Sequence, residues 1–277
     1  MKSPLSLLSL TVTSLAFLAM PFNLASDPLP SLPAFSRTSG LSIDYRVLPS
    51  HRELQEALRK VVRDGNNGGF ALNMWVTVVN RDGVVLGVAF SGGNRGDQWP
   101  GSRVISAQKA NAANAFSLPK LALSTANLYS AVQPGGSLYG LADSNPVNTD
   151  AAYSGSALLY GTDCDPMVGK RIGGINTFGG GLPLYDRDGR LIGALGVSGD
   201  TSCADHIIAW KLRHALNFDN VPAGVSATKD DNIVHDLKKD EYGHPVSASG
   251  WGHPTVGDEA KRIAEALPRT HPVGPQR

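Results

Sequence analysis

Two polar turns of the same kind, 106 residues apart, place the tightest limit on what this chain can fold into. The first is Asn-Arg-Asp-Gly at 80–83, and the second is Asp-Arg-Asp-Gly at 186–189. Apolar runs flank both turns, at 70–79 and 84–90 and at 182–185 and 191–198. Because a turn ending in Asp-Gly between two such runs is typical of a β-hairpin, each copy predicts an antiparallel strand pair. The repetition indicates either a duplicated hairpin–helix unit or the same turn chemistry arising twice.

Helical patterns accompany the hairpins. After Ser50, which can cap a helix, apolar residues recur at helical spacing until Gly65, and this predicts a helix over 50–65. An alanine-rich run at 102–116 predicts a helix that packs closely against the sheet or against another subunit, so we expect oligomerisation to use it. A short helix is expected from Pro119 to about residue 129, and a closing helix over 203–216.

With a further strand at 172–178, these elements predict an α/β fold in which an antiparallel sheet of about five strands is flanked by helices. The main domain is expected over residues 45–217. Residues 130–170 have little periodicity and many turn-forming residues, as in a long loop that is functional or tied down. Residues 218–277 are polar with isolated apolar positions, which predicts an irregular C-terminal tail.

The amino terminus has the layout of a secretory signal peptide. Lys2 precedes an apolar run over residues 5–20, and small residues follow near Ala25. The run is shorter than the roughly 20 residues that a membrane-spanning helix needs. We therefore expect a signal peptide at 1–25, a linker at 26–44, a periplasmic or secreted location, and no stable membrane span once the signal is removed.

The two cysteines, Cys164 and Cys203, both follow the expected signal peptide. In an oxidising compartment they are expected to form a disulfide, which would stabilise the fold by about 3–4 kcal/mol in the chain-entropy model. A thiolate metal site is the alternative, because Cys203 and His206 are three residues apart and close to one helical face.

Charge and missing motifs exclude several functions. Lys and Arg number 25 against 24 Asp and Glu, and this balance lacks the positive field that nucleic-acid binding requires. The segment Gly-Val-Ser-Gly-Asp at 196–200 departs from the nucleophile elbow of serine hydrolases at its last position. The glycines at 169–174 match neither nucleotide-binding fingerprint.

The remaining candidates could bind an iron porphyrin or a small ligand. His206 follows Asp205 in the first turn of the closing helix, and an imidazole oriented by a carboxylate is a common iron ligand arrangement. His214 lies among apolar residues near the end of the same helix and could be a ligand or a partly buried structural residue. His253 lies in a loop and could reach a ligand. A surface histidine near a helix start is the alternative for His206.

Lys109 stands alone as a cation in the alanine-rich run. It could pair with a propionate or substrate carboxylate, or with Asp97 or another internal acid. Arg95 and Asp97 are most simply a solvated pair in a loop.

Four segments resemble the GlcG/HbpS family of haem-binding proteins. They are the alanine-rich run 107–116, Gly-Gly-Leu-Pro at 180–183, Gly-Ala-Leu-Gly-Val-Ser-Gly at 193–199 and Asp-His-Ile-Ile-Ala at 205–209. They occur in the family's order and spacing, and the resemblance covers roughly residues 45–217. It implies a profilin-like fold, assembly into homo-oligomers, and binding of haem or iron that is presented to a sensor protein at the cell surface.

The family profile is also labelled haem-degrading, and some members are associated with glycolate or propanediol metabolism. This chain departs from the family at Ala112, where Thr is common, and in its long loop and C-terminal tail. On the strength of the resemblance, our first hypothesis is an exported, non-enzymatic haem-binding protein. The residues themselves make His206 the candidate iron ligand, and Lys109 and His214 are further candidate haem contacts. A binder of a small organic acid, which would use Lys109, is the second hypothesis, and a haem-degrading enzyme is the third.

Overall fold

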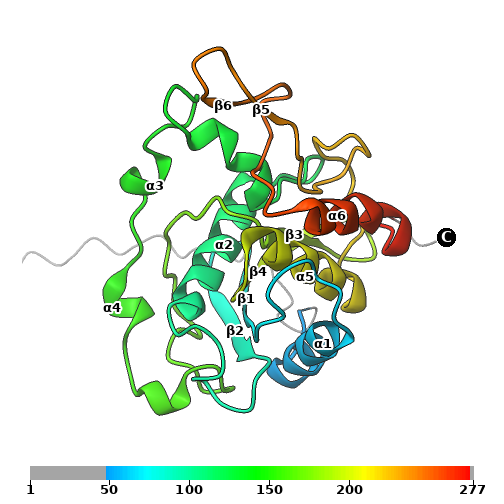
Figure 1. Cartoon of the computed structure of the whole chain (residues 1–277). Helices are drawn as coiled ribbons and strands as arrows, with labels where there is room; N and C mark the ends of the chain where they lie inside the picture. Colours follow the sequence, from blue (N-terminus) through cyan, green and yellow to red (C-terminus); the bar gives the residue numbers. More distant parts are fainter. Residues whose placement is uncertain (1–47, 275–277) are drawn as a thin grey trace, which may run out of the picture. The chain divides into compact units, whose positions relative to one another are not determined.

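A four-stranded antiparallel sheet in the order β2-β1-β4-β3 forms the centre of the computed structural model, which describes residues 48–274 (Figure 1). The predicted signal peptide and linker lie outside the described residues. The strands are β1 (Trp75–Asn80), β2 (Val85–Phe90), β3 (Gly181–Tyr185) and β4 (Leu191–Ser198). Each of the two polar turns closes one hairpin, as the sequence predicts, and the hairpins join through β1 and β4.

The sheet has four strands rather than about five, because residues 172–178 do not form one. This stretch makes only isolated bridges, such as Val147 to Gly173. Gly173 and Gly174 have φ values of 62° and 75°, in the left-handed region, so the backbone cannot remain extended there.

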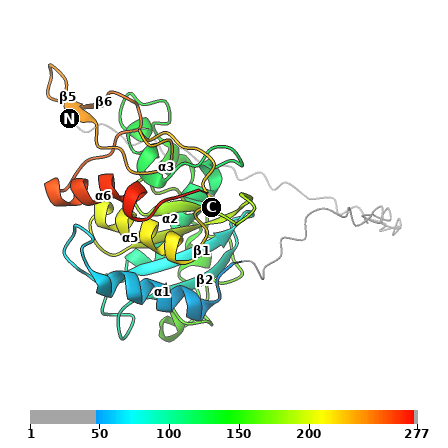
Figure 2. The same ribbon diagram turned by 90° about the vertical axis from the view of Figure 1, so that its right-hand side faces the viewer.

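Helices cover both faces of the sheet. Alternate side chains of β1 point to opposite sides: Val76 and Val78 pack toward α1 (His51–Asp64) and α5 (Ser202–Ala215), whereas Trp75 and Val79 pack toward α2 (Ser102–Phe116). Figure 2 shows α1, α5 and α6 (Asp258–Thr270) stacked side by side. The predicted helices at 50–65, 102–116 and 203–216 are confirmed, and Ser50 with Glu53 forms a capping box at the start of α1.

The alanines of α2 pack inside their own chain. A Cβ at Gly196 of β4 would lie 2.0 Å from the carbonyl oxygen of Ser106, so the helix backbone rests directly on the strand. Ala107, Ala110 and Ala113 are fully buried in this contact. The sheet is therefore the packing partner of these alanines, and the expectation that oligomerisation uses this helix stays a prediction.

Between α2 and β3 the chain forms a long loop with short helical turns. The predicted helix from Pro119 is wrong: Leu118 and Leu121 close a tight turn around Pro119, and the chain then runs without helix to Ser124, whose side chain helps to cap a single 3₁₀ turn, η1 (Thr125–Leu128). Further short turns follow, namely η2 (Ser130–Val132), α3 (Leu141–Ser144), α4 (Thr149–Ala152) and η3 (Ala157–Leu159).

A buried ion pair holds this loop to the core. The guanidinium of Arg103 in α2 donates to Asp165 (Nε to Oδ2, 2.9 Å), and the ring of Tyr160 stacks on it. The loop is therefore tied down by Asp165 and not by the neighbouring Cys164. Both cysteines are free: Cys164 is exposed, and Cys203 is buried at the start of α5 under the carbonyl of Pro254. The predicted disulfide is absent from the structure because the two side chains occupy these different environments.

The C-terminal segment, residues 218–274, is folded rather than irregular. It contains a small hairpin, β5 (Leu237–Lys239) with β6 (Pro245–Ser247), and the helix α6. Apolar residues of α6 recur at helical spacing and pack on α5; they are Ala260, Ile263, Ala264 and Leu267. Within residues 48–274 no helix is long and apolar enough to cross a membrane.

Candidate functional site

Lys109 is enclosed by an ion pair. Its ammonium is 2.6 Å from Oδ2 of Asp205 and donates also to the carbonyl of Val197, 3.2 Å away. A Cβ at Gly180 would approach the ammonium to 3.1 Å, so only glycine leaves room for it. The internal acid that holds Lys109 is thus Asp205 rather than Asp97.

Asp205 in turn anchors the end of β4. Its second oxygen accepts a hydrogen bond from the backbone N–H of Asp200 at 3.0 Å. Burial raises the pKa of Asp205 to about 6, although Lys109 favours the charged form. The pair joins α2, β4 and α5 in the protein interior, and this geometry leaves Lys109 poorly placed to meet a substrate carboxylate.

His206 is fully buried. Its Nε2 lies 3.2 Å from Oδ1 of Asn232 and 3.1 Å from the backbone nitrogen of Ile233. Nδ1 is buried without a hydrogen-bond partner among the described residues. Burial lowers the pKa of His206 to about 3, so the ring is neutral. The adjacent Asp205 does not orient this imidazole, because its carboxylate is committed to Lys109.

His253 is also enclosed, with 1% of its surface exposed. Nε2 accepts a hydrogen bond from the N–H of Gly179 (3.3 Å), and Nδ1 donates to the carbonyl of Pro254 (2.7 Å). Its ring packs against Tyr129 and Phe178. With both ring nitrogens engaged, His253 has no lone pair available for a metal in this conformation.

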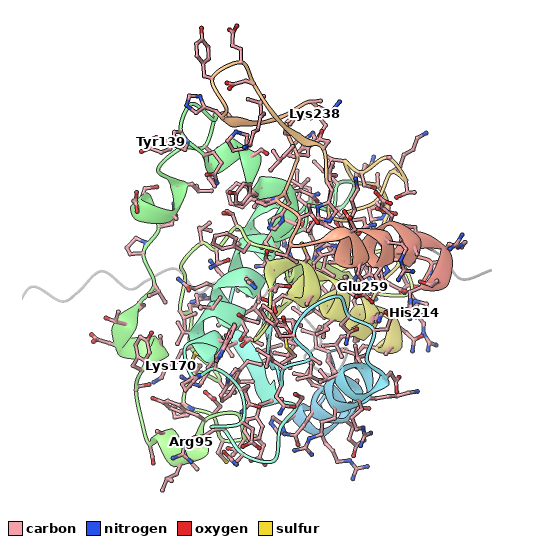
Figure 3. All side chains as sticks on the ribbon, viewed as in Figure 1. Arg95, Tyr139, Lys170, His214, Lys238 and Glu259 are labelled. Atoms are coloured by element: carbon pink, nitrogen blue, oxygen red, sulfur yellow. The ribbon has the colours of Figure 1, made fainter. Side chains whose placement is uncertain are left out.

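His214 has a different environment. It lies in the last turn of α5, and about a quarter of its side chain is exposed (Figure 3). Nδ1 is 2.6 Å from Oδ2 of Asp219, so a carboxylate fixes the ring and leaves Nε2 as the available nitrogen. The ring of His271 meets it edge to face, with centroids 5.3 Å apart.

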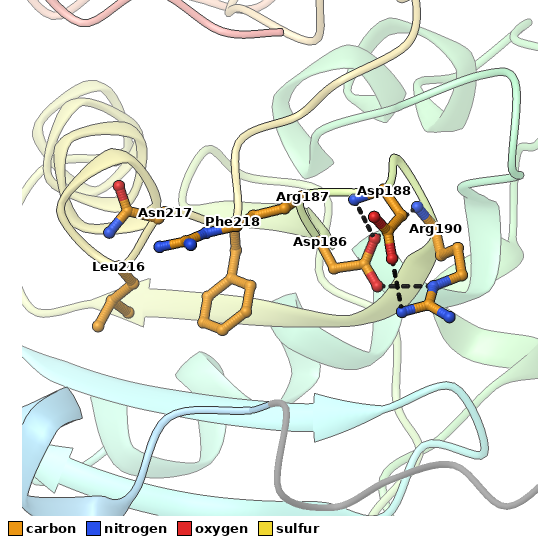
Figure 4. A pocket seen from close by; sticks show the side chains of 7 residues that line it. All are labelled: Asp186, Arg187, Asp188, Arg190, Leu216, Asn217 and Phe218. Carbon is orange, nitrogen blue, oxygen red and sulfur yellow. Dashed lines mark hydrogen bonds and ion pairs between the residues drawn. The ribbon is translucent and has the colours of Figure 1, made fainter. Parts of the chain in front are cut away.

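The residues that follow His214 line two cavities. The smaller, of about 330 Å³, lies between the β3–β4 turn and the chain after α5 and is lined by Asp186, Arg187, Asp188, Arg190, Leu216, Asn217 and Phe218 (Figure 4). The larger, of about 490 Å³, extends to α1 and shares Leu216, Asn217 and Phe218. These volumes fall within the range of small-molecule sites. Neither cavity is lined by His206, Lys109, His253 or His214 itself; the residues directly after His214 provide the lining.

Cations stand beside both cavities. Arg187 lines the smaller one, and Lys60 of α1 lines the larger. Arg190 is held by Asp186, with 2.8 Å between Nε and Oδ2, so its charge is already matched. In the other loop, Asp97 accepts hydrogen bonds from the backbone N–H groups of Gly93 and Asn94, an arrangement within the loop itself rather than a pair with Arg95.

Sequence reasoning missed the partner of His214. Asp219 is five residues away and lies beyond the end of the helix, so no helical spacing signals the contact. It also missed the contact of His214 with His271, because the two residues are far apart in the sequence. Among residues 48–274 no group of three or more His, Cys, Asp or Glu side chains is arranged to hold a metal ion.

One family model matches most of the sheet-forming part of the chain. The model of the family described as "Haem degrading protein HbpS-like" matches residues 50–212. No curated protein sequence matches the chain.

Several solved structures are similar to this chain at low scores. PduOC in complex with haem is 26% identical, covers 61% of this chain and 95% of its own, and gives a TM-score of 0.42. Klebsiella pneumoniae ORFY is 24% identical with 67% and 97% coverage and a TM-score of 0.42. A double mutant of Streptomyces reticuli HbpS is 16% identical with 68% and 96% coverage and a TM-score of 0.38.

The four family-like motifs occupy α2, β3, β4 and the start of α5, which are the elements that carry the sheet and its buried ion pair. They are also contained in the matched segment, which spans more than half of the chain. The chain belongs to the HbpS-like family.

Proposed function

We propose that this protein binds haem and that His214 supplies the iron ligand. Membership of a family described as haem-degrading motivates the ligand. The observation that carries the choice of residue is the 2.6 Å contact between Nδ1 of His214 and Asp219, on a ring that is partly exposed. A carboxylate on one ring nitrogen fixes the tautomer and raises the basicity of the other, as in many metal-bound histidines.

The surroundings of His214 suit a flat, largely apolar ligand with two carboxylates. Leu216 and Phe218 supply apolar surface at the two cavities, and Arg187 and Lys60 supply positive charge for propionates. When bound, haem would contribute the iron chemistry, and the protein would contribute the ligand, the apolar contact and the charge.

His206 and Lys109 are not part of this proposal. His206 is fully buried, whereas His214 is partly exposed, and Lys109 is bound to Asp205, so neither His206 nor Lys109 can contact haem unless the packing around α5 opens. Binding of a small organic acid through Lys109 lacks support for the same reason. Haem binding is therefore the function that the described geometry favours.

A titration of the purified protein with haem tests the proposal. We expect a saturable Soret band with a one-to-one endpoint, and the absence of any band would refute binding. A second arm adds peroxide or a reductant: a stable band indicates binding alone, whereas bleaching indicates the degradation for which the family is described. Export to the periplasm and delivery of haem to a surface sensor are further proposals, which secretion assays and pull-down with membranes would test.

His51 provides the control residue. One of its ring nitrogens, Nε2, is 2.9 Å from the carbonyl of Gly161, which makes it a partly buried histidine oriented by a backbone group. Its partner is a carbonyl and not a carboxylate, so it lacks the contact that selects His214 as the ligand. We expect His51→Ala to keep the Soret band, and loss of the band in this variant would move the ligand from α5 to α1.

A further inference from the structure

The start of α5 is covered by two short pieces of the C-terminal segment, residues 232–235 and 252–254, which we call the strap. A parallel bridge between Val234 and Gly252 joins the pieces, and the N–H of His253 donates to the carbonyl of Val234 at 2.8 Å. The family match ends at residue 212, so the strap is an addition of this chain to the matched segment.

The strap is attached to the core at its first end, which we call the hinge. Asp231, immediately before it, forms a fully buried ion pair with Arg213 of α5, with 2.6 Å and 2.8 Å between the paired nitrogen and oxygen atoms. Arg213 donates also to the carbonyl of Pro183 in β3. One end of the strap is therefore attached to the core by an interaction that persists at any pH at which Asp231 is ionised.

Beyond the hinge, the strap holds the core through weaker neutral contacts. Ile233 and Asn232 meet the ring of His206, and Asn127 of η1 donates to the carbonyl of Asn232 at 2.9 Å. His253 accepts from Gly179 at 3.3 Å. The thiol of Cys203 contacts the carbonyl of Pro254 at 3.4 Å, and the hydroxyl of Ser130 donates to the carbonyl of Gly252 at 2.6 Å. We call this line of contacts between the strap and the core the seam.

Two histidines lie on opposite sides of this seam. His206 belongs to α5 and is sealed by the strap, and His253 belongs to the strap and is sealed by the core. Both are buried, and burial lowers the pKa of His206 to about 3 and that of His253 to about 4. Opening the strap returns both rings to water, where a histidine ordinarily titrates near 6.5.

Positively charged neighbours disfavour protonation of His206 and His253 while the strap is closed. Arg213 on α5 disfavours a charged His206, and Lys109 on α2 disfavours a charged His253. His235, the second histidine of the strap, faces α6: burial lowers its pKa most, Lys261 lowers it further and Glu265 raises it.

The acids at the same end of the core are engaged elsewhere. Asp205 holds Lys109, and Asp200 accepts from the backbone of Phe70 and Leu72. Neither forms a hydrogen bond with the strap. No described carboxylate is therefore in place to stabilise a charged ring of His206 or His253 while the strap stays closed.

We propose that the strap is a pH-sensitive cover that closes over His206 at neutral pH and opens when the pH falls toward 5. The open form takes up protons on His206 and His253, so acid favours it, and the Asp231–Arg213 pair keeps the strap tethered. Opening exposes the ring of His206 and the thiol of Cys203, both of which are fully buried in the closed form. The proposal does not depend on haem binding.

The chain contains its own reporter for this motion. Cys203 lies under the strap, whereas Cys164 is exposed and distant in the loop, so the ratio of their labelling rates cancels most of the pH dependence of the reagent. The experiment labels the reduced full-length protein with a pyridyl disulfide at pH 7.5 and at pH 5.0, and mass spectrometry of peptides reads the two sites.

We expect the labelling ratio of Cys203 to Cys164 to rise about tenfold or more between pH 7.5 and pH 5.0, because each uncovered histidine contributes up to about tenfold per pH unit below 6.5. The double variant His206→Gln with His253→Gln removes two of the three buried rings at the strap and should lose most of the rise. His244→Gln, on the exposed β5–β6 turn, is the matched control and should keep the rise. A flat ratio in the wild type, or an undiminished rise in the double variant, would overturn the proposal.

Hydrogen exchange of the wild type decides the question if the double variant does not fold. After correction for the intrinsic effect of pH, the amides of Ile233 and His253 should exchange faster at pH 5.0, while those of β1 stay protected. Equal protection of the strap at both pH values contradicts the proposal, and so does simultaneous loss of protection in β1, which indicates global unfolding.

Discussion

The two ends of helix α5 carry similar residues and use them in opposite ways. At the first end, His206 follows Asp205 directly, yet the carboxylate turns toward Lys109 and the ring is sealed under the C-terminal segment. At the last end, His214 is separated from Asp219 by four residues, yet the two are 2.6 Å apart and the ring is partly exposed. The sequence analysis paired His206 with Asp205 because they are adjacent, whereas the acid–histidine contact in the structure joins His214 and Asp219.

The physical reason is the geometry of the helix. Consecutive residues point about 100° apart around the axis, so neighbours such as Asp205 and His206 face different parts of the protein. The chain after His214 leaves the helix and folds back, and this change of direction brings Asp219 to the ring. The central claim of the account is that the exposed end of α5, and not the buried end, can meet a ligand.

The largest expected effect concerns the buried end. Lys109→Met leaves Asp205 as an unpaired buried carboxylate, and breaking such a pair from one side costs about 3–5 kcal/mol of unfolding free energy. Urea unfolding measures the loss, and the double variant Lys109→Met with Asp205→Leu should recover a large part of it. Haem affinity of the folded Lys109→Met protein should stay unchanged. A stability loss below about 1 kcal/mol, or weakened haem binding, would contradict the buried structural role of Lys109.

The second effect is acid sensitivity of the same end. His206 and His253 have pKa values of about 3 and 4 in the folded protein against about 6.5 when unfolded, so the native state binds fewer protons. Their contribution to stability is complete above pH 6.5 and is lost as the pH falls, by up to about 1.4 kcal/mol per pH unit for each ring.

Asp205 acts in the opposite direction. Its pKa is raised to about 6 in the folded protein, so its contribution is present at low pH and is lost as the pH rises through 6. From pH 7 to pH 5 the sum predicts a net decrease of about 2–3 kcal/mol in unfolding free energy. Urea unfolding at the two pH values checks the sign, and greater stability at pH 5 would show that the two rings are not buried as described.

A third and smaller effect tests the role of Asp219 at the exposed end of α5. Asp219→Asn keeps the shape of the side chain but removes the charge that orients His214, and loss of such a supporting carboxylate lowers metal affinity by about 10- to 100-fold. Haem titration measures the change. Asp188→Asn, an exposed acid at the smaller cavity, is the control and should bind haem as the wild type does. Equal affinities for the two variants would remove Asp219 from the site.

Local sequence signals predicted the fold well where they are self-contained. The Ser50 cap and Gly65 stop bound α1, and the two polar turns place all four strands. The helix at Pro119 failed because the hydroxyl of Ser124, with Asn127, caps a shorter turn. The helix α6 was overlooked although its apolar spacing is visible, since its polar surroundings resemble a tail.

The site was less predictable because it depends on contacts between distant segments. Nothing near Lys109 in the sequence indicates Asp205, which is 96 residues away. Burial of His206 depends on Asn232 and Ile233, which lie outside the segment that resembles the family. Residue type alone therefore identified the histidines of α5 as candidates and could not distinguish between them.

The Soret spectrum of two matched variants tests the central claim most directly. His214→Ala and His206→Gln change one histidine each at opposite ends of α5, and far-UV circular dichroism confirms that both proteins are folded. The account predicts that haem added to His214→Ala gives no wild-type Soret band, whereas His206→Gln gives the wild-type band at the same endpoint. A retained band in His214→Ala together with a lost or shifted band in His206→Gln would contradict the account.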